Sequence, residues 1–240
     1  MKVICPYVFE EEIQKHKDDF WMYDVYYEKD VGKIGSDLMF QKMWNKFPKQ
    51  DIFILHADMS PMYDNWLEDV FTYVDKYPNA GMIGCMLLYP AKNEEGDYYI
   101  QHAGGMFNEN NSPDHYGSGL VLENSSKFKE TLEVDKGQYD YVRKVPWTTF
   151  GGVYIRREVI NKVGNFSPLY EWTYNRDVDY CLRTREAGWD IINIPVKLFH
   201  HESRDNKRLK TADKLKAEMR NLETLKKLWA NTEWYKNINE

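Results

Sequence analysis

Two side chains able to bind a metal ion follow a short, wholly apolar run. Residues 52–55 (IFIL) lead directly into His56, Ala57 and Asp58. Such a run is typical of a strand buried in a parallel sheet, and in these sheets ligands bind beyond the carboxyl ends of the strands. An imidazole and a carboxylate at that point can share a divalent cation such as manganese. The alternative is that Asp58 only caps the turn before Pro61, and the segment taken alone favours that alternative.

A second cluster of charged residues is Arg176-Asp177-Val178-Asp179. Two acids at this spacing point to different faces of a helix start, so they cannot serve one function together. Asp177 suits the cap position, and Asp179 suits the first turn, where negative charge is favourable near the helix N-terminus. Capping explains one acid more readily than two, so one of them is alternatively a general base.

Adjacent histidines are a third candidate, in the segment 199–203 (FHHES), after an expected strand and Pro195. His200 and His201 are either metal ligands or structural and surface histidines. Beyond them, residues 204–210 (RDNKRLK) are basic in an otherwise acidic protein. This stretch either clamps a diphosphate or is solvated chain that leads into a helix.

Composition excludes several classes of protein. The 240 residues carry 32 Lys and Arg against 38 Asp and Glu, a net charge of −6, whereas a nucleic-acid binder needs a basic face. No apolar run approaches the roughly 20 residues of a membrane span, and the start of the sequence does not resemble a signal peptide. Cys5, Cys85 and Cys181 are far apart, which favours reduced core cysteines of a cytoplasmic protein.

The elements that must position these residues alternate between strands and helices, which is typical of an α/β sheet with helices packed on it. The segment 91–145 is polar and predicts an irregular, substrate-facing insert of loops and short strands. We expect one domain, residues 1–210, with a C-terminal amphipathic helix in 211–240 packed on it. Expected strands span residues 2–5, 24–27, 51–55, 81–89, 149–155 and 190–194; expected helices span 36–44, 66–76, 157–163, 178–187 and 211–229.

Two longer segments resemble family 2 glycosyltransferases with the GT-A fold, in their bacterial rhamnosyltransferase-like branch. Residues 171–203 follow the family's order of an acidic helix start, Ala-Gly-Trp, a strand and a His-His-x-Ser close. Residues 147–166 (WTTFGGVYIRREVINKVGNF) resemble the segment that precedes it. LLYP and IQHAGG, between residues 87 and 105, also match, and residues 54–58 stand in the place of the metal-binding D-x-D motif. The resemblance covers roughly residues 50–203.

This resemblance implies an α/β fold of GT-A type, a Rossmann-like mixed sheet flanked by helices in a single domain. It implies an inverting hexosyltransferase that uses a nucleotide diphosphate sugar, with UDP-glucose or UDP-galactose favoured, in glycan or polysaccharide synthesis. Asp177 is then the general base, and Asp58 and His200 hold Mn²⁺ or Mg²⁺, with His201 as a reserve ligand. The acceptor hydroxyl belongs to a glycan, a lipid-linked sugar or a protein.

The resemblance also implies a nucleotide-sugar site, in which Trp147 or Trp172 stacks on a sugar face. The chain departs from the family pattern where His56 replaces the first acid of D-x-D and Arg176 replaces the Glu of the usual Glu-Asp pair. The N-terminal half is also compressed. The residues expected to contact the nucleotide sugar are Tyr7, Asp30, Lys33, His56, Ala57, Gly151, Gly152, Arg204 and Lys207.

Two other functions compete with transfer. A non-catalytic nucleotide-sugar or carbohydrate-binding module on a degenerate GT-A scaffold would explain the departures at His56 and Arg176, and it would bind a donor without turning it over. A GT-A nucleotidyltransferase would need a Gly-rich phosphate loop with a basic residue after the first strand. The chain has CPYVF at residues 5–9 instead, which disfavours that function.

Overall fold

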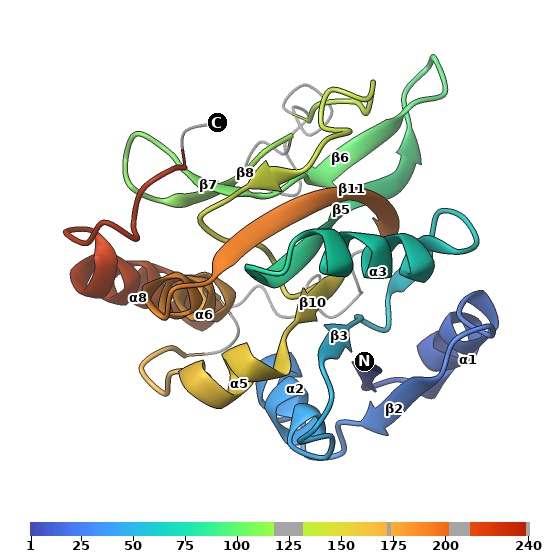
Figure 1. Ribbon diagram of the computed structural model, residues 1–240, viewed down its shortest axis with the longest axis horizontal. Helices are drawn as coiled ribbons and strands as arrows, with labels where there is room; N and C mark the ends of the chain where they lie inside the picture. Colours follow the sequence, from blue (N-terminus) through green and yellow to red (C-terminus); the bar gives the residue numbers. More distant parts are fainter. Residues whose placement is uncertain (118–131, 172–173, 202–211, 239–240) are drawn as a thin grey trace.

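A mainly parallel sheet forms the centre of the computed structural model, which describes residues 1–117, 132–171, 174–201 and 212–238 (Figure 1). Strands β1, β2, β3, β5 and β11 all run in one direction, while β10 and β4 run in the other. The mixed sheet confirms the expected α/β class. In spatial order its main strands are β2 (Val25–Lys29), β1 (Lys2–Tyr7), β3 (Ile52–Ile54), β10 (Val153–Ile155), β5 (Ala80–Lys92), β11 (Asp190–His200) and β4 (Met59–Pro61).

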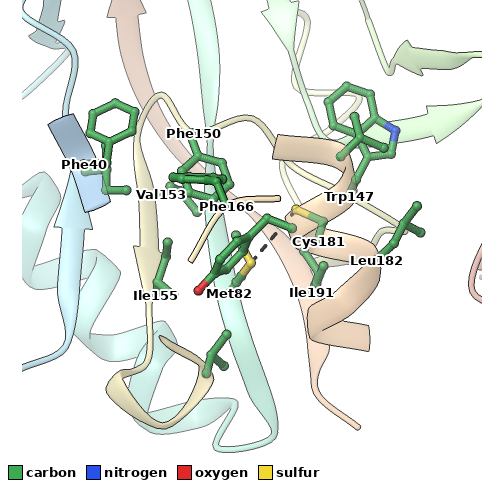
Figure 2. Close-up of a cluster of buried hydrophobic side chains, with 14 of the residues drawn as sticks. Phe40, Met82, Trp147, Phe150, Val153, Ile155, Phe166, Cys181, Leu182 and Ile191 are labelled. Atoms are coloured by element: carbon green, nitrogen blue, oxygen red, sulfur yellow. Dashed lines mark hydrogen bonds between the residues drawn. The ribbon is translucent and has the colours of Figure 1, made fainter. Parts of the chain in front are cut away.

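Helices cover both faces of this sheet, because successive strand residues point to opposite faces. Ile4 and Ile52 belong to one buried cluster, and their neighbours Val3 and Phe53 belong to another. Figure 2 shows part of the first cluster, with Met82 near its centre. The first cluster includes residues of α2 (Ser36–Trp44), α5 (Arg157–Val163) and α6 (Arg176–Glu186), and the second those of α1 (Glu10–Asp19) and α3 (Trp66–Lys76).

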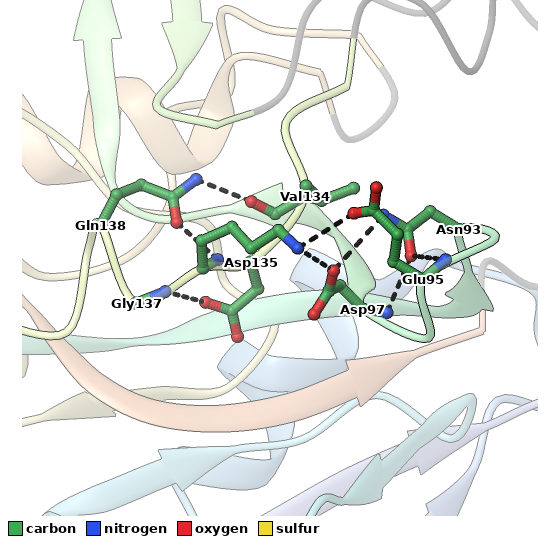
Figure 3. Close-up of polar contacts among 8 residues, drawn as sticks. Asn93, Glu95, Asp97, Val134, Asp135, Gly137 and Gln138 are labelled. Atoms are coloured by element: carbon green, nitrogen blue, oxygen red, sulfur yellow. Dashed lines mark hydrogen bonds and ion pairs between the residues drawn. The ribbon is translucent and has the colours of Figure 1, made fainter.

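Four short strands lie outside this order: β6 (Tyr98–His102) pairs with β5 and β9 (Arg143–Lys144) pairs with β11, whereas β7 (Gly105–Phe107) and β8 (Pro113–His115) form a separate two-stranded sheet. A polar network ties the turn between β5 and β6 to the segment 133–138, where the Lys136 ammonium contacts the carboxylates of Glu95 and Asp97 (Figure 3). The Asn93 side-chain oxygen accepts the backbone N–H groups of Glu95 and Asp97, so the turn is held on both sides.

The C-terminal helix α8 (Ala212–Trp229) packs on the same core through Leu225 and Trp229. Its docking depends on the buried carboxylate of Asp179, which accepts the Trp229 indole N–H at 2.9 Å and the Tyr170 hydroxyl at 3.1 Å. The Arg183 guanidinium pairs with the same carboxylate at 2.9 Å. Asp179 therefore has a structural role. Within the described ranges, no helix is both long and apolar enough to cross a membrane.

Replacing Asp179 by alanine should lower the free energy of unfolding by about 3 kcal/mol, because it leaves two buried donors and the partly buried guanidinium of Arg183 without their shared partner. Urea denaturation followed by circular dichroism measures the loss. Asp213→Ala, on the exposed part of α8, is the matched control and should change stability by less than about 0.5 kcal/mol. Equal midpoints for the two variants would contradict the role assigned to Asp179.

The structure corrects two expectations about the elements and agrees with a third. Helix α1 was not expected, because its sequence EEEIQKHKDD buries only Ile13 and His16. Strand β11 does not end near Ile194 but continues through Pro195 to His200, with an irregularity between Ile194 and Lys197; such an irregularity accommodates a residue that has no backbone N–H. The described part of the segment 91–145 contains the short strands β6, β7, β8 and β9, in agreement with the expected insert of loops and short strands.

Candidate functional site

The candidate site lies at the carboxyl edge of the parallel strands, where the sheet topology gathers segments that are far apart in sequence. The chain leaving β3 and the end of β11 both emerge there. Because β10 runs the opposite way, the residues that precede it, Gly151 and Gly152, are at the same edge. Helices α2 and α6 each precede a parallel strand, so both begin at this edge, with Asp37 and Asp177 in their first turns.

Three possible metal ligands meet at this edge. One ligand atom each from His56, Asp58 and His200 lie within 4.8 Å of one another. His56 and Asp58 follow β3, and the pairing of β4 with β11 sets Met59 opposite His200. This register places the Asp58 carboxylate 3.3 Å from His200 Nε2, and the imidazole rings of His56 and His200 meet edge to face at 5.5 Å. We call these three residues the metal group.

The protonation of the metal group suits a divalent cation. His200 Nδ1 lies 2.7 Å from the Gln101 side-chain oxygen, which accepts its proton, so Nε2 is the nitrogen that faces the Asp58 carboxylate. A proton on Nε2 pairs with that carboxylate, and a bound cation would displace it. Burial, and then the nearby His200, lower the pKa of His56 to about 4, which keeps this imidazole neutral. Burial by itself would raise the pKa of Asp58, but His200 outweighs it and holds that pKa well below the usual range.

One atom of the metal group lacks a partner. His56 Nε2 is buried and makes no hydrogen bond to any described residue, although burying a polar atom unpaired is costly. A second imidazole and a carboxylate lie within reach of it. Two imidazole nitrogens and one carboxylate are donors that transition metals accept, so these residues fit a metal ion.

His201, expected as a reserve ligand, is outside the metal group. Neighbouring residues at the end of a strand point to opposite sides, and His201 Nε2 instead lies 2.9 Å from the Ser60 hydroxyl. Its backbone N–H donates to the Asp58 carbonyl oxygen at 2.8 Å. His201 thus joins β11 to the loop that carries Asp58. The second histidine beside the Asp58 carboxylate is therefore His56, and not the reserve ligand His201.

Gly151 lies against the metal group. A Cβ added at Gly151 would be 3.7 Å from two atoms of the His56 ring, so this backbone borders the space around the imidazole. Gly152 has φ +67° and little free space, a conformation that favours glycine. Its backbone is held by Ile54 and Cys85, on the two neighbouring strands. Ala57, between His56 and Asp58, packs against the buried cluster beneath the loop.

Asp177 lies in the first turn of α6 and is partly buried. Burial raises its pKa to about 6, opposed by hydrogen bonds from the backbone N–H groups of Val178 and of Asp177 itself. An acid with this pKa is ionised at neutral pH and is more basic than an ordinary aspartate, which suits a general base. The sequence suggested Asp177 as the N-cap of this helix, but the N-cap is Asn175.

The N-terminal residues expected to contact a nucleotide have partners within the protein. Asp30 is buried, and its two carboxylate oxygens accept the backbone N–H groups of Ile34 and Gly35 at 3.0 Å. These bonds shape the loop between β2 and α2, in which Lys33 is exposed with φ +49°. The Tyr7 hydroxyl, at the end of β1, lies 3.5 Å from Glu10.

Of the two tryptophans expected to stack on a sugar, the structure describes one, Trp147. Trp147 is only 2% exposed, and its indole N–H donates to the Met106 carbonyl oxygen at 2.9 Å. Its ring is packed against His115 and His102, so it is a core residue here and not a surface for a sugar. Trp172, together with Arg204 and Lys207, lies outside the residues that the structure describes.

Sequence reasoning missed Asp37. It is 7% exposed at the start of α2, and its Oδ2 lies 3.8 Å from Nη1 of Arg176. One turn later on the same helix, the Phe40 ring stacks on His56 at 5.6 Å. Helix α2 therefore contacts both the metal group and the start of α6. The signal available in the sequence was an acid in the first turn of a helix that begins at the carboxyl edge.

Comparisons with known proteins place the fold. No protein-family model matches the sequence. The chain is 25% identical to the uncharacterized protein y4gI of Sinorhizobium fredii over 179 residues. The aligned region covers 74% of this chain and 18% of that protein. The crystal structure of GalNAc-T7 with UDP, GalNAc and Mn²⁺ aligns with a TM-score of 0.57 at 13% identity, covering 97% of this chain and 42% of that chain.

The catalytic domain of Drosophila β1,4-galactosyltransferase 7, in complex with xylobiose, aligns with a TM-score of 0.47 at 14% identity, over 91% of this chain and 79% of that one. The chain spans 18% of the length of the curated relative and 42% of the GalNAc-T7 chain. The likeness to GalNAc-T7 identifies the fold as that of the GT-A glycosyltransferases.

Proposed function

We propose that the chain is a metal-dependent glycosyltransferase that moves a hexose from a UDP-sugar to an acceptor hydroxyl with inversion. One observation carries the proposal: His56, Asp58 and His200 converge within 4.8 Å at the carboxyl edge of a GT-A sheet, where such folds bind ligands. GalNAc-T7, with the same fold, was crystallised with UDP, GalNAc and Mn²⁺. UDP-glucose or UDP-galactose is the donor that we favour, in glycan or polysaccharide synthesis.

The metal group would hold the cation through His56 Nε2, the Asp58 carboxylate and His200 Nε2. Mg²⁺ prefers oxygen ligands, whereas imidazole suits transition metals. The two histidines therefore favour Mn²⁺ over Mg²⁺. When bound, such a cation would stabilise the negative charge that develops on the departing diphosphate.

The protein residues would supply the remaining steps. Asp177 would accept the proton of the acceptor hydroxyl as that oxygen attacks the anomeric carbon. Gly151, which has no side chain, would let the donor sugar approach the backbone beside His56. Arg204 and Lys207 remain proposed contacts of the diphosphate, where positive charge would favour binding. The acceptor is a glycan, a lipid-linked sugar or a protein.

A panel of nucleotide sugars tests this function. UDP release is measured for UDP-glucose, UDP-galactose and UDP-N-acetylgalactosamine, with Mn²⁺, Mg²⁺ or EDTA, for the wild type and Asp177→Asn. We expect release from one donor, stimulated by Mn²⁺ and lost in the variant. Donor binding without release, with glycan, lipid-linked and peptide acceptors present, would support the non-catalytic binding module instead. No donor binding at all would mean that only the fold is shared.

A further inference from the structure

Helices α2 and α6 bring three charged side chains together in a buried place. Asp37 comes from the first turn of α2, and Arg176 and Asp177 come from the first turn of α6. The Asp37 and Arg176 side chains are 10% and 14% exposed, and Asp37 Oδ2 lies 3.8 Å from Arg176 Nη1. Two acids therefore share the surroundings of a single cation.

The hydrogen bonds around Asp37 suit a neutral acid better than a buried carboxylate. Its Oδ2 is buried and has no hydrogen-bond partner among the described residues, and the same is true of Arg176 Nε. Arg176 instead donates from Nη2 to the Tyr170 carbonyl oxygen at 2.5 Å. Because a buried carboxylate oxygen without a hydrogen bond is costly, the protonated form of Asp37 is favoured at this place.

The electrostatics of Asp37 agree with this geometry. Burial, and then the negative charge of Asp177, raise the pKa of Asp37 to about 8, while Arg176 and a hydrogen bond from Ser36 oppose the rise. Among the described residues, the groups that act on the Asp37 carboxyl are thus Arg176 and Asp177 on α6 and Ser36 on its own helix. When two carboxyl groups share a site, one pKa is raised and the other group ionises first.

We propose that Asp37 is a positioning residue, which orients Arg176 at the start of α6 and leaves the single negative charge of the site on Asp177. This inference rests on the proposed function, in which Asp177 is the general base. Arg176 stands at the position where the family pattern has an acid before Asp177. Asp37, from another helix, places an acid beside that position. Through Phe40, which stacks on His56, the same helix also contacts the metal group.

Stability as a function of pH tests the shared charge without any substrate. An acid whose pKa is raised in the folded state binds more protons folded than unfolded, so the free energy of unfolding falls as pH rises from its ordinary pKa to the raised one. For Asp37 this fall extends up to about 8, whereas that of Asp177 ends near 6. The buried histidines His16, His56 and His115, whose pKa values burial lowers to about 4, make stability rise with pH over part of this range. They contribute equally to the wild type and to an Asp37 variant, so the difference between the urea midpoints of the two isolates Asp37.

We expect the urea midpoint of the wild type to fall relative to that of Asp37→Asn across this range, since asparagine cannot ionise. Asp177→Asn removes the like charge, so it should shift the fall to lower pH. Asp75→Asn, an exposed acid on α3, is the control and should follow the wild type. Parallel curves for the wild type and Asp37→Asn would overturn the proposal.

Kinetics then test positioning. Asp37→Leu, which cannot hold Arg176, should lower kcat by roughly tenfold or more with little change in the donor KM, because misplacing a reacting group by about 1 Å can cost a hundredfold. Asp37→Asn should recover most of that loss at neutral pH. Equal kcat in the wild type and Asp37→Leu would overturn positioning. A pH-dependent midpoint in a protein that transfers no sugar would refute the proposed function, and with it the catalytic meaning of the shared charge.

Discussion

Asp58→Ala is expected to weaken Mn²⁺ binding on the order of a hundredfold or more, because changing only an outer partner of a metal ligand already costs 10–100-fold. Asp58 supplies the single carboxylate of the metal group, next to two imidazoles. Without it, His56 and His200 remain as neutral ligands that cannot balance the charge of the cation. Isothermal titration with MnCl₂, alone and with UDP, measures the loss, and metal-dependent UDP release should disappear with it.

The fold should tolerate this substitution. The bond from the His201 N–H to residue 58 uses the backbone carbonyl, and it survives the removal of the carboxylate. Asp64→Ala, an exposed acid in the loop after β4, is the matched control and should bind Mn²⁺ as the wild type does. Unchanged Mn²⁺ affinity in Asp58→Ala, together with a normal unfolding curve, would reject the metal group.

Local patterns were enough to predict most of the elements. The helices 36–44, 66–76 and 157–163 have the expected ends, because each has apolar residues at helical spacing. Helix α1 lacks that signal: it buries only Ile13 and His16 and is otherwise charged and polar. Its helical state depends on packing against β1 and β4, a tertiary contact that the local sequence does not encode.

The candidate site was predictable only in part, for the same reason. The family resemblance implied that Asp58 and His200 share a metal ion, and the position of each after an expected strand is compatible with this, since parallel strands end at one edge. The choice between His56 and His201 depends on the pairing of Met59 with His200, which fixes the side to which each imidazole points. Asp37 is 139 residues before Arg176 in the chain, and only the parallel placement of α2 and α6 brings them together.

The second large effect is expected at Asp177. Asp177→Asn should lower kcat at least about a hundredfold, the usual lower range for removing a general base, because an amide cannot accept the acceptor proton. Donor and Mn²⁺ binding should be retained, since Asp177 lies outside the metal group. Asparagine is nearly the same size and can still accept the backbone N–H of Val178, so the start of α6 should keep its shape.

The pH profile makes this prediction specific to a base. Burial raises the pKa of Asp177 to about 6, and a base works in its ionised form, so kcat/KM of the wild type should rise with pH through about 6 and then level off. The residual activity of Asp177→Asn should lack this rise. Glu186→Gln, an exposed acid near the other end of α6, is the control and should keep both the rate and the profile. A parallel loss of donor binding and turnover in Asp177→Asn would assign the residue to binding and leave the proton without an acceptor among the residues proposed, so the transfer mechanism itself would have to be revised.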